Sequence, residues 1–181
     1  MKYTMSVLVE NQPGVLSRVS GLFSRRGFNI DSLAVGVTED PTISRMTIVV
    51  DGDEYVVEQL EKQLNKVIPV IKVKTLETGA YIPRTLSLIK VAVGASQRAE
   101  IMRVTELMGA KIVDATRTTM TVEFSDTAER TETLETLLRP YGVKEIVRTG
   151  IIAIEKGPDP TRTVKKYVPR VYDDPLRDRH I

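Results

Sequence analysis

A short turn between a strand pattern and a helix pattern carries the residue types that could do chemistry. It reads Asn11-Gln12-Pro13-Gly14-Val15-Leu16-Ser17. Pro13 suits the first position of a helix, where a missing N–H costs nothing. Gly14 has no side chain to keep a ligand away from the backbone. The N–H groups of Gly14, Val15 and Leu16, at the positive end of a helix dipole, therefore favour a bound carboxylate.

Two further residues extend this candidate site. Asn11 offers a hydrogen-bond donor and an acceptor, and Asn29 offers the same groups at the start of the next strand, where Ile30 adds an apolar wall. A carboxylate holder, amide groups and an aliphatic wall together fit a small apolar amino acid. The same residues also fit an ordinary turn and helix start, with Asn29 following Gly27 at a helix exit. Spacing alone leaves both interpretations open.

Composition narrows the possible functions. The chain has 181 residues, of which 41% are hydrophobic and 28% charged, with a formal net charge of +2. This charge is too small to indicate general nucleic-acid binding. There is no cysteine, and the one histidine is His180, so thiolate or histidine metal sites and histidine-based catalysis are not expected. We expect small molecules and other proteins as partners.

The elements that position the turn follow from periodicity. Residues 3–10 alternate as a half-buried strand, and a helix then runs to Gly27. Strands are predicted over 30–37, 43–51 and 70–73, with a second helix opening near Asp53. The order β-α-β-β-α-β is that of a ferredoxin-like unit.

The same order is then repeated. Strands are predicted over 86–93, 111–115, 119–124 and 144–154, with a helix near Ser96 and another opening at Asp126, where Glu129 completes a capping box. Aligning Gly27 with Gly109 places Val93 at Asn11, so the scaffold repeats and the ligand turn does not. The predicted organisation is a first domain over 1–76, a linker over 77–84, a second domain over 85–156 and an irregular tail over 157–181.

Two longer stretches carry a family resemblance. Residues 9–16 (VENQPGVL) and 25–33 (RRGFNIDSL) resemble the ACT domain of the acetolactate synthase small, regulatory subunit. The similarity continues through 44–47 and 84–90 and covers roughly residues 1–155. ACT domains in general share only a loose D/N-x-P-G-x-L turn, whereas the run over 25–33 is specific to this subunit. The resemblance implies an α+β fold of two tandem ferredoxin-like domains, the first of them an ACT domain.

The resemblance also implies a function. The family's small subunit is not catalytic; it activates a large subunit that carries thiamine diphosphate, magnesium and FAD, and it confers feedback inhibition by branched-chain amino acids, usually valine. Two ACT domains pair side by side, with the effector at their interface. Carried over to this chain, Asn11, Gly14, Val15 and Leu16 would face the effector from one copy, and Asn29 and Ile30 from the other. Pro13 and Ser17 would support the turn.

Other functions fit the sequence less well. An amino-acid-binding ACT regulator of transcription would need a helix-turn-helix, and no segment is spare to form one. A small enzyme of the acylphosphatase type would need a phosphate-gripping loop beside an arginine and an asparagine, which the sequence lacks. No membrane-spanning run or signal-peptide pattern is seen. We therefore expect a cytoplasmic protein, or a stromal one if the source is photosynthetic, although no transit peptide is seen.

Overall fold

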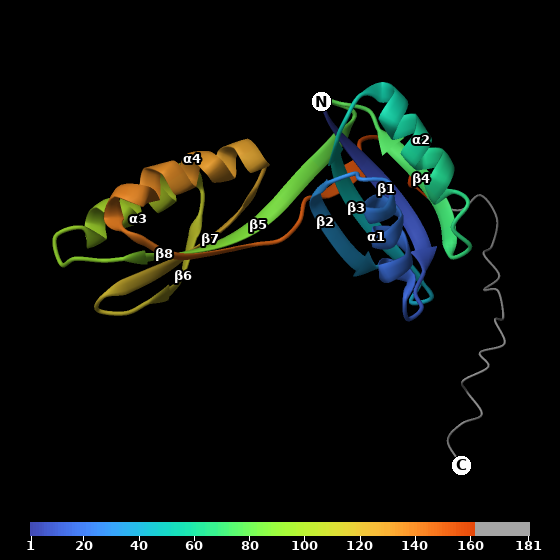
Figure 1. The fold of residues 1–181 in the computed structure, drawn as a ribbon. Coiled ribbons are helices and arrows are strands. Elements are labelled where there is room, and N and C mark those ends of the chain that lie inside the picture. Colours follow the sequence, from blue (N-terminus) through green and yellow to red (C-terminus); the bar gives the residue numbers. More distant parts are fainter. Residues whose placement is uncertain (162–181) are drawn as a thin grey trace, which may run out of the picture.

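The computed structural model describes residues 1–161 and shows two βαββαβ units in tandem (Figure 1). The sheets have the strand orders β2-β3-β1-β4 and β6-β7-β5-β8, with all the pairings antiparallel. The predicted α+β class and the tandem repeat are therefore confirmed. The first unit contains β1 (Lys2–Glu10), α1 (Val15–Arg25), β2 (Ile30–Val37), β3 (Ile43–Asp51), α2 (Glu54–Leu64) and β4 (Val70–Leu76).

The second unit follows the same order and ends in one extra strand. The strand β9 pairs with the beginning of β5 and lies outside the second unit's sheet path. The elements are β5 (Tyr81–Ala92), α3 (Arg98–Met108), β6 (Lys111–Ala115), β7 (Thr119–Asp126), α4 (Ala128–Leu138), a 3₁₀ turn (Arg139–Tyr141), β8 (Val143–Arg148) and β9 (Ile152–Glu155).

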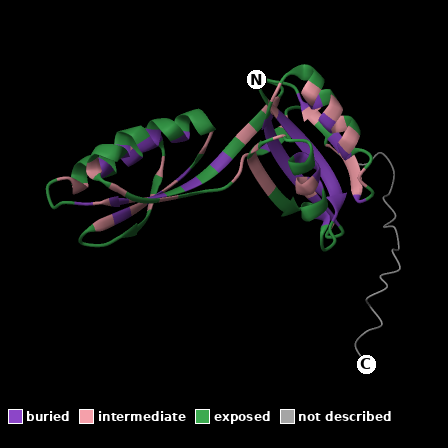
Figure 2. Cartoon of the chain, viewed as in Figure 1, coloured by how far each residue is buried: buried purple, intermediate pink, exposed green. Residues whose placement is uncertain are grey.

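Each unit has its own hydrophobic core between its sheet and its two helices. In β1 the residues of one face, Met5, Val7 and Val9, are fully buried against the helices, as the alternation predicts. The other face is buried as well, with Thr4 5% and Ser6 0% exposed, so the expectation of a half-buried strand is wrong. In the second unit Ile89 and Val91 of β5 occupy the matching place. In Figure 2 the buried residues, in purple, follow both sheets and the inner faces of the helices. The two cores share no residue, so the units are separate packing domains.

The strand β5 belongs to both units. Its residues from Thr85 onward pair with β7 and β8, whereas Tyr81–Arg84 pair with β9. We call Tyr81–Arg84 together with β9 the arm. Within the predicted linker over 77–84, residues 81–84 form a strand. The single strand predicted over 144–154 is wrong, because it divides into β8 and β9 around Gly150.

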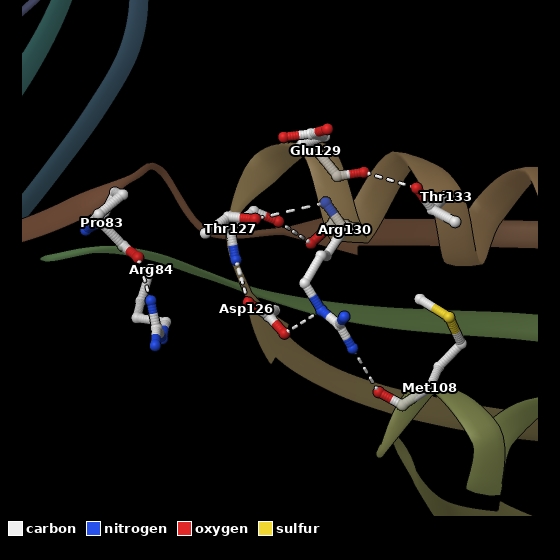
Figure 3. Close-up of polar contacts among 9 residues, drawn as sticks. Pro83, Arg84, Met108, Asp126, Thr127, Glu129, Arg130 and Thr133 are labelled. Atoms are coloured by element: carbon white, nitrogen blue, oxygen red, sulfur yellow. Dashed lines mark hydrogen bonds and ion pairs between the residues drawn. The ribbon is translucent and has the colours of Figure 1, made fainter. Parts of the chain in front are cut away.

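The helix α4 begins one residue later than expected. Asp126 is the predicted cap, but Thr127 occupies that position, and its Oγ1 accepts a hydrogen bond from the Arg130 N–H at 3.4 Å. Asp126 instead accepts from the Thr127 N–H at 2.7 Å and pairs with Nε of Arg130 at 2.6 Å (Figure 3). Both residues thus hold the first turn of α4, and Glu129 completes no capping box.

Candidate functional site

The predicted ligand turn is a type II turn over Gln12–Val15. Gly14 has φ +79° and ψ −6°, which are the values that the third residue of such a turn requires, and Pro13 fills the favoured second position. The Val15 N–H donates to the Gln12 carbonyl at 3.4 Å. The helix α1 begins only at Val15, so the expectation that Pro13 is its first residue is wrong. Glycine is needed at position 14 primarily for its positive φ.

The start of α1 leaves backbone donors open. No side chain caps this helix, and among the described residues the N–H groups of Gly14, Leu16 and Ser17 have no backbone partner. Of the three predicted donors, Val15 is the exception, because its N–H closes the turn. A Cβ built on Gly14 meets nothing within 4 Å. The turn therefore presents open N–H groups and free space at the positive end of a helix dipole.

The side chains of this helix start divide by exposure. Val15 is 5% exposed and belongs to the core, whereas Leu16 is 44% exposed and available to a ligand or partner. Pro13 and Ser17 are exposed. The Ser17 hydroxyl forms no hydrogen bond to the turn among the described residues. The support of the turn by Ser17 stays a prediction.

Asn11 joins the turn to the loop between β2 and β3. Its Nδ2 donates to the Pro41 carbonyl at 2.9 Å, and its backbone N–H donates to the Thr42 carbonyl at 2.7 Å. An asparagine amide has two N–H donors and one carbonyl acceptor. One donor is thus used within the fold, and the remaining donor and the acceptor are left for a ligand.

Asn29 and Ile30 lie at the opposite end of the same sheet. Ile30 pairs with Val50, near the end of β3, whereas Asn11 binds the residue that precedes β3. Val50 and Thr42 are eight residues apart along the chain, roughly 26 Å at the rise of a strand. Asn29 donates to Oδ1 of Asp31 at 3.1 Å. Within one chain the structure therefore brings Asn11, Gly14, Val15 and Leu16 together but not Asn29 and Ile30.

Residues just after Ile30 contact the second unit, which sequence reasoning missed. The register of β2 shifts between Ile30 and Ser32, and Oγ of Ser32 accepts a hydrogen bond from the Ile151 N–H at 2.7 Å. A Cβ built on Gly150 would lie only 2.2 Å from the Leu33 carbonyl oxygen. The sequence did contain a signal for this contact, because Gly150 lies inside a strand pattern, where a glycine indicates a bulge or a close backbone approach.

The arm docks on the face of the first sheet that lies opposite its helices (Figure 1). The Tyr81 hydroxyl lies 3.0 Å from the Thr4 hydroxyl, and the Arg45 guanidinium donates to the Ala153 carbonyl at 2.7 Å. Nζ of Lys74 pairs with Glu155 at 2.6 Å. These contacts come from three strands of the first unit, so the arm holds the two units together.

The carboxyl of Glu155 makes this docking sensitive to pH. The hydrogen bond from Lys74 is the largest influence, and together with Thr161 and Arg45 it lowers the pKa of Glu155 against the opposing effect of desolvation. A carboxyl whose pKa is lower in the folded state stabilises the fold above its unfolded pKa, about 4.3. That stability is lost as the pH falls through the pKa that Glu155 has in the folded state.

We predict that Glu155→Gln lowers the free energy of unfolding at pH 7 by up to about 1 kcal/mol. The difference from the unmodified chain should disappear at a pH below the lowered pKa of Glu155, where both chains carry a neutral group at this position. Urea unfolding at the two pH values measures this. Glu58→Gln, in the exposed pair with Lys62 on α2, is the control for an ion pair that joins no domains. An equal effect of Glu155→Gln at both pH values would contradict the prediction.

The described residues contain neither a candidate metal centre nor a helix that could cross a membrane. Within residues 1–161 no three histidine, cysteine or carboxylate side chains gather where a metal ion could bind. None of the helices described is both long and apolar enough to span a bilayer. His180 and most of the predicted tail over 157–181 lie outside the described residues. The turn before α1 remains the candidate site.

Comparison with known proteins agrees with this organisation. A family model described as the AHAS small subunit-like ACT domain matches residues 5–72, and one described as the small subunit of acetolactate synthase matches residues 84–157. An acetolactate synthase small subunit of Mycolicibacterium smegmatis is 49% identical over 156 residues, which are 86% of this chain and 92% of the relative. A probable acetolactate synthase small subunit of Archaeoglobus fulgidus is 50% identical over 157 residues, 87% and 98% of the two chains.

A solved structure has the same arrangement of elements. The crystal structure of the acetolactate synthase small subunit from Thermotoga maritima superposes with a TM-score of 0.83 at 37% identity, and it covers 88% of this chain and 99% of that one. The matches span both units and nearly the full length of each relative. This chain belongs to the acetolactate synthase small-subunit family, and its first unit is an ACT domain.

Proposed function

We propose that this chain is the regulatory subunit of an acetolactate synthase, which activates a catalytic large subunit and makes it sensitive to feedback inhibition by valine or a related branched-chain amino acid. The observation that carries the proposal is the uncapped start of α1 behind a type II turn with a left-handed Gly14. Its open N–H groups suit the carboxylate of an amino acid. In this proposal the chemistry, with thiamine diphosphate, magnesium and FAD, belongs to the large subunit.

The strand arrangement supports an effector site shared by two copies. The strand β2 is an edge of the first sheet, and an isologous pair of such edges runs antiparallel about a twofold axis. The beginning of one β2 then lies beside the end of the other, at the same end of the sheet as the Asn11–Leu16 turn. Asn29 and Ile30 of one copy would complete the site of its partner, which they cannot do within one chain.

A coupling route to the large subunit can start at this shared site. Ser32 and Leu33, two and three residues after Ile30, contact Ile151 and Gly150 of the second unit. A shift of β2 on effector binding would therefore change the position of the second unit. Allosteric couplings of this kind amount to about 1–3 kcal/mol, which corresponds to strong but incomplete inhibition.

Titration calorimetry of the full chain with valine, leucine and isoleucine, alone and with the large subunit, tests the proposal. We expect saturable binding of valine, two sites per dimer, and inhibition of the activated enzyme over the same concentration range. Valine is one methylene smaller than leucine and isoleucine, so its affinity should differ from theirs by roughly 10–200-fold. If the chain neither raises the activity of the large subunit nor binds any of the three amino acids, the proposed function is wrong.

A further inference from the structure

Within the described residues a single side chain of β2, that of Ser32, forms a hydrogen bond to the second unit. Its Oγ accepts from the Ile151 N–H at 2.7 Å. The side chains that link the other strands of the first unit to the arm are those of Thr4 on β1, Arg45 on β3 and Lys74 on β4. Ser32 is therefore the polar link between the second unit and the strand that begins at the candidate effector residues.

The beginning of β2 is interrupted by a bulge just before Ser32. Ile30 and Ser32 pair with consecutive residues of β3, so Asp31 between them has no partner in the ladder. A bulge of this kind disrupts the ladder locally. Asp31 is held instead by the Asn29 amide, which donates to it at 3.1 Å, and by Nζ of Lys2 at 3.4 Å. The beginning of β2 can therefore shift without sliding the rest of the strand along β3.

The Asn29 amide connects the candidate effector site to this bulge. One of its two N–H groups is used by Asp31, and its other N–H and its carbonyl are left for an effector. An effector that reorients this amide therefore changes the contact that holds Asp31. Ser32 is the next residue along the chain, so the distance from the effector contact to the contact with the second unit is three residues.

On the other side of the contact, Ile151 is tied to the second unit by the residues just before it. The Thr149 N–H donates to the Leu86 carbonyl at 2.9 Å, and the Thr149 hydroxyl accepts from the Leu86 N–H at 3.0 Å. Arg148 pairs with Oε2 of Glu135 at 2.5 Å, and Glu135 is a buried residue of α4. A force on Ile151 is therefore passed to both the sheet and a helix of the second unit.

We propose that Ser32 is the positioning residue that transmits effector binding to the second unit. Binding at Asn29 moves the beginning of β2, and the hydrogen bond from Ile151 to Ser32 converts this movement into a new position of the second unit. This inference rests on the proposed function, since it names how binding at the shared site regulates the large subunit.

Ser32→Ala tests this inference, because it removes the acceptor of the Ile151 N–H and leaves every effector contact in place. Titration calorimetry with valine should give the affinity of the unmodified chain. Activation of the large subunit in the absence of valine should be kept. The ratio of the activities without and with saturating valine should fall by about fivefold or more, which is the lower end of the usual range of allosteric coupling.

Two matched variants separate transmission from the general docking of the units. Ser32→Thr keeps a hydroxyl and places a residue that suits strands, so it should inhibit as the unmodified chain does. Thr4→Val removes the hydroxyl that lies 3.0 Å from the Tyr81 hydroxyl, which also joins the units but starts from β1. It should leave the inhibition by valine unchanged. Urea unfolding of each variant checks that the chain is folded.

A folded Ser32→Ala chain that inhibits as fully as the unmodified chain would overturn the assignment of Ser32. A Thr4→Val chain that loses as much inhibition would also overturn it, because the docking of the whole arm would then be the link. Loss of valine binding in Ser32→Ala would place Ser32 in the binding site and overturn it as well. All three results presuppose an unmodified chain that binds valine and inhibits, whereas failure of the proposed function appears in the unmodified chain itself and removes the site on which Ser32 acts.

Discussion

Gly14→Asp is expected to abolish inhibition by valine while leaving the activation of the large subunit in place. The substitution places a carboxylate beside the open N–H groups of Leu16 and Ser17, where the effector carboxylate is proposed to bind. The new carboxylate and the effector carboxylate would repel each other strongly at such a short distance, because little water lies between them to screen the charges. We expect the valine concentration for half-maximal inhibition to rise by more than about 100-fold. Activity assays of the reconstituted enzyme over a valine titration measure it.

Two matched variants separate charge from backbone strain at this position. Asparagine tolerates a left-handed backbone about as well as aspartate does, so Gly14→Asn keeps the shape and removes the charge. Gly109 has φ +74° and no atom within 4 Å of a built Cβ, and Gly109→Asp repeats the substitution in the second unit. Inhibition should be only partly weakened in Gly14→Asn and unaffected in Gly109→Asp. A folded Gly14→Asp variant with full sensitivity to valine would exclude the turn as the effector site.

Gly150→Ala should undock the arm from the first unit. The added methyl carbon would lie 2.2 Å from the Leu33 carbonyl oxygen and 2.9 Å from the Ala34 backbone nitrogen. Both are backbone atoms of a paired strand, so they cannot rotate away as a side chain would. We expect a loss of about 2–4 kcal/mol, from overpacking and from the Ser32–Ile151 hydrogen bond. Denaturant unfolding measures the loss of stability, and hydrogen exchange at the Ile151 amide measures the loss of its hydrogen bond to Ser32.

Gly36→Ala is the matched control for this substitution, because its new methyl group has open space around it. It should unfold at the midpoint of the unmodified chain and keep the Ile151 amide protected. In Gly150→Ala the effector should still bind at the turn, but its effect on the large subunit should weaken, since β2 no longer contacts the second unit. Unchanged protection of Ile151 in Gly150→Ala would contradict the docking geometry.

Much of the fold could be predicted because its signals are local. Alternating residues in β1 and β3 and the glycine after α1 mark their elements without reference to the rest of the chain. The arm could not be predicted in this way, because a proline such as Pro83 usually indicates the end of a strand. In the structure Pro83 pairs only with β9, and β7 and β8 begin to pair further along. Its missing N–H thus faces an unpaired edge, where proline is tolerated.

The site was predictable in its residues more than in its geometry. The turn motif identifies Gly14, but the sequence does not reveal that the Val15 N–H closes the turn or that Asn11 already binds Pro41. The Asn11 contact depends on the loop between β2 and β3, which is remote in sequence. The separation of Asn29 from Asn11 depends on the strand order, which periodicity alone does not fix.

The arm also sets an order of events during synthesis. The first unit has all of its own strands once Leu76 has emerged, but Arg45, Lys74 and Ser32 find their partners only in residues 151–155. At typical rates of translation these roughly 80 further residues take about 4–16 s. During that interval one face of a folded sheet lacks its cover. A newly made chain is thus exposed to wrong partners until its last strand arrives, and a product that stops short of Glu155 never leaves that state.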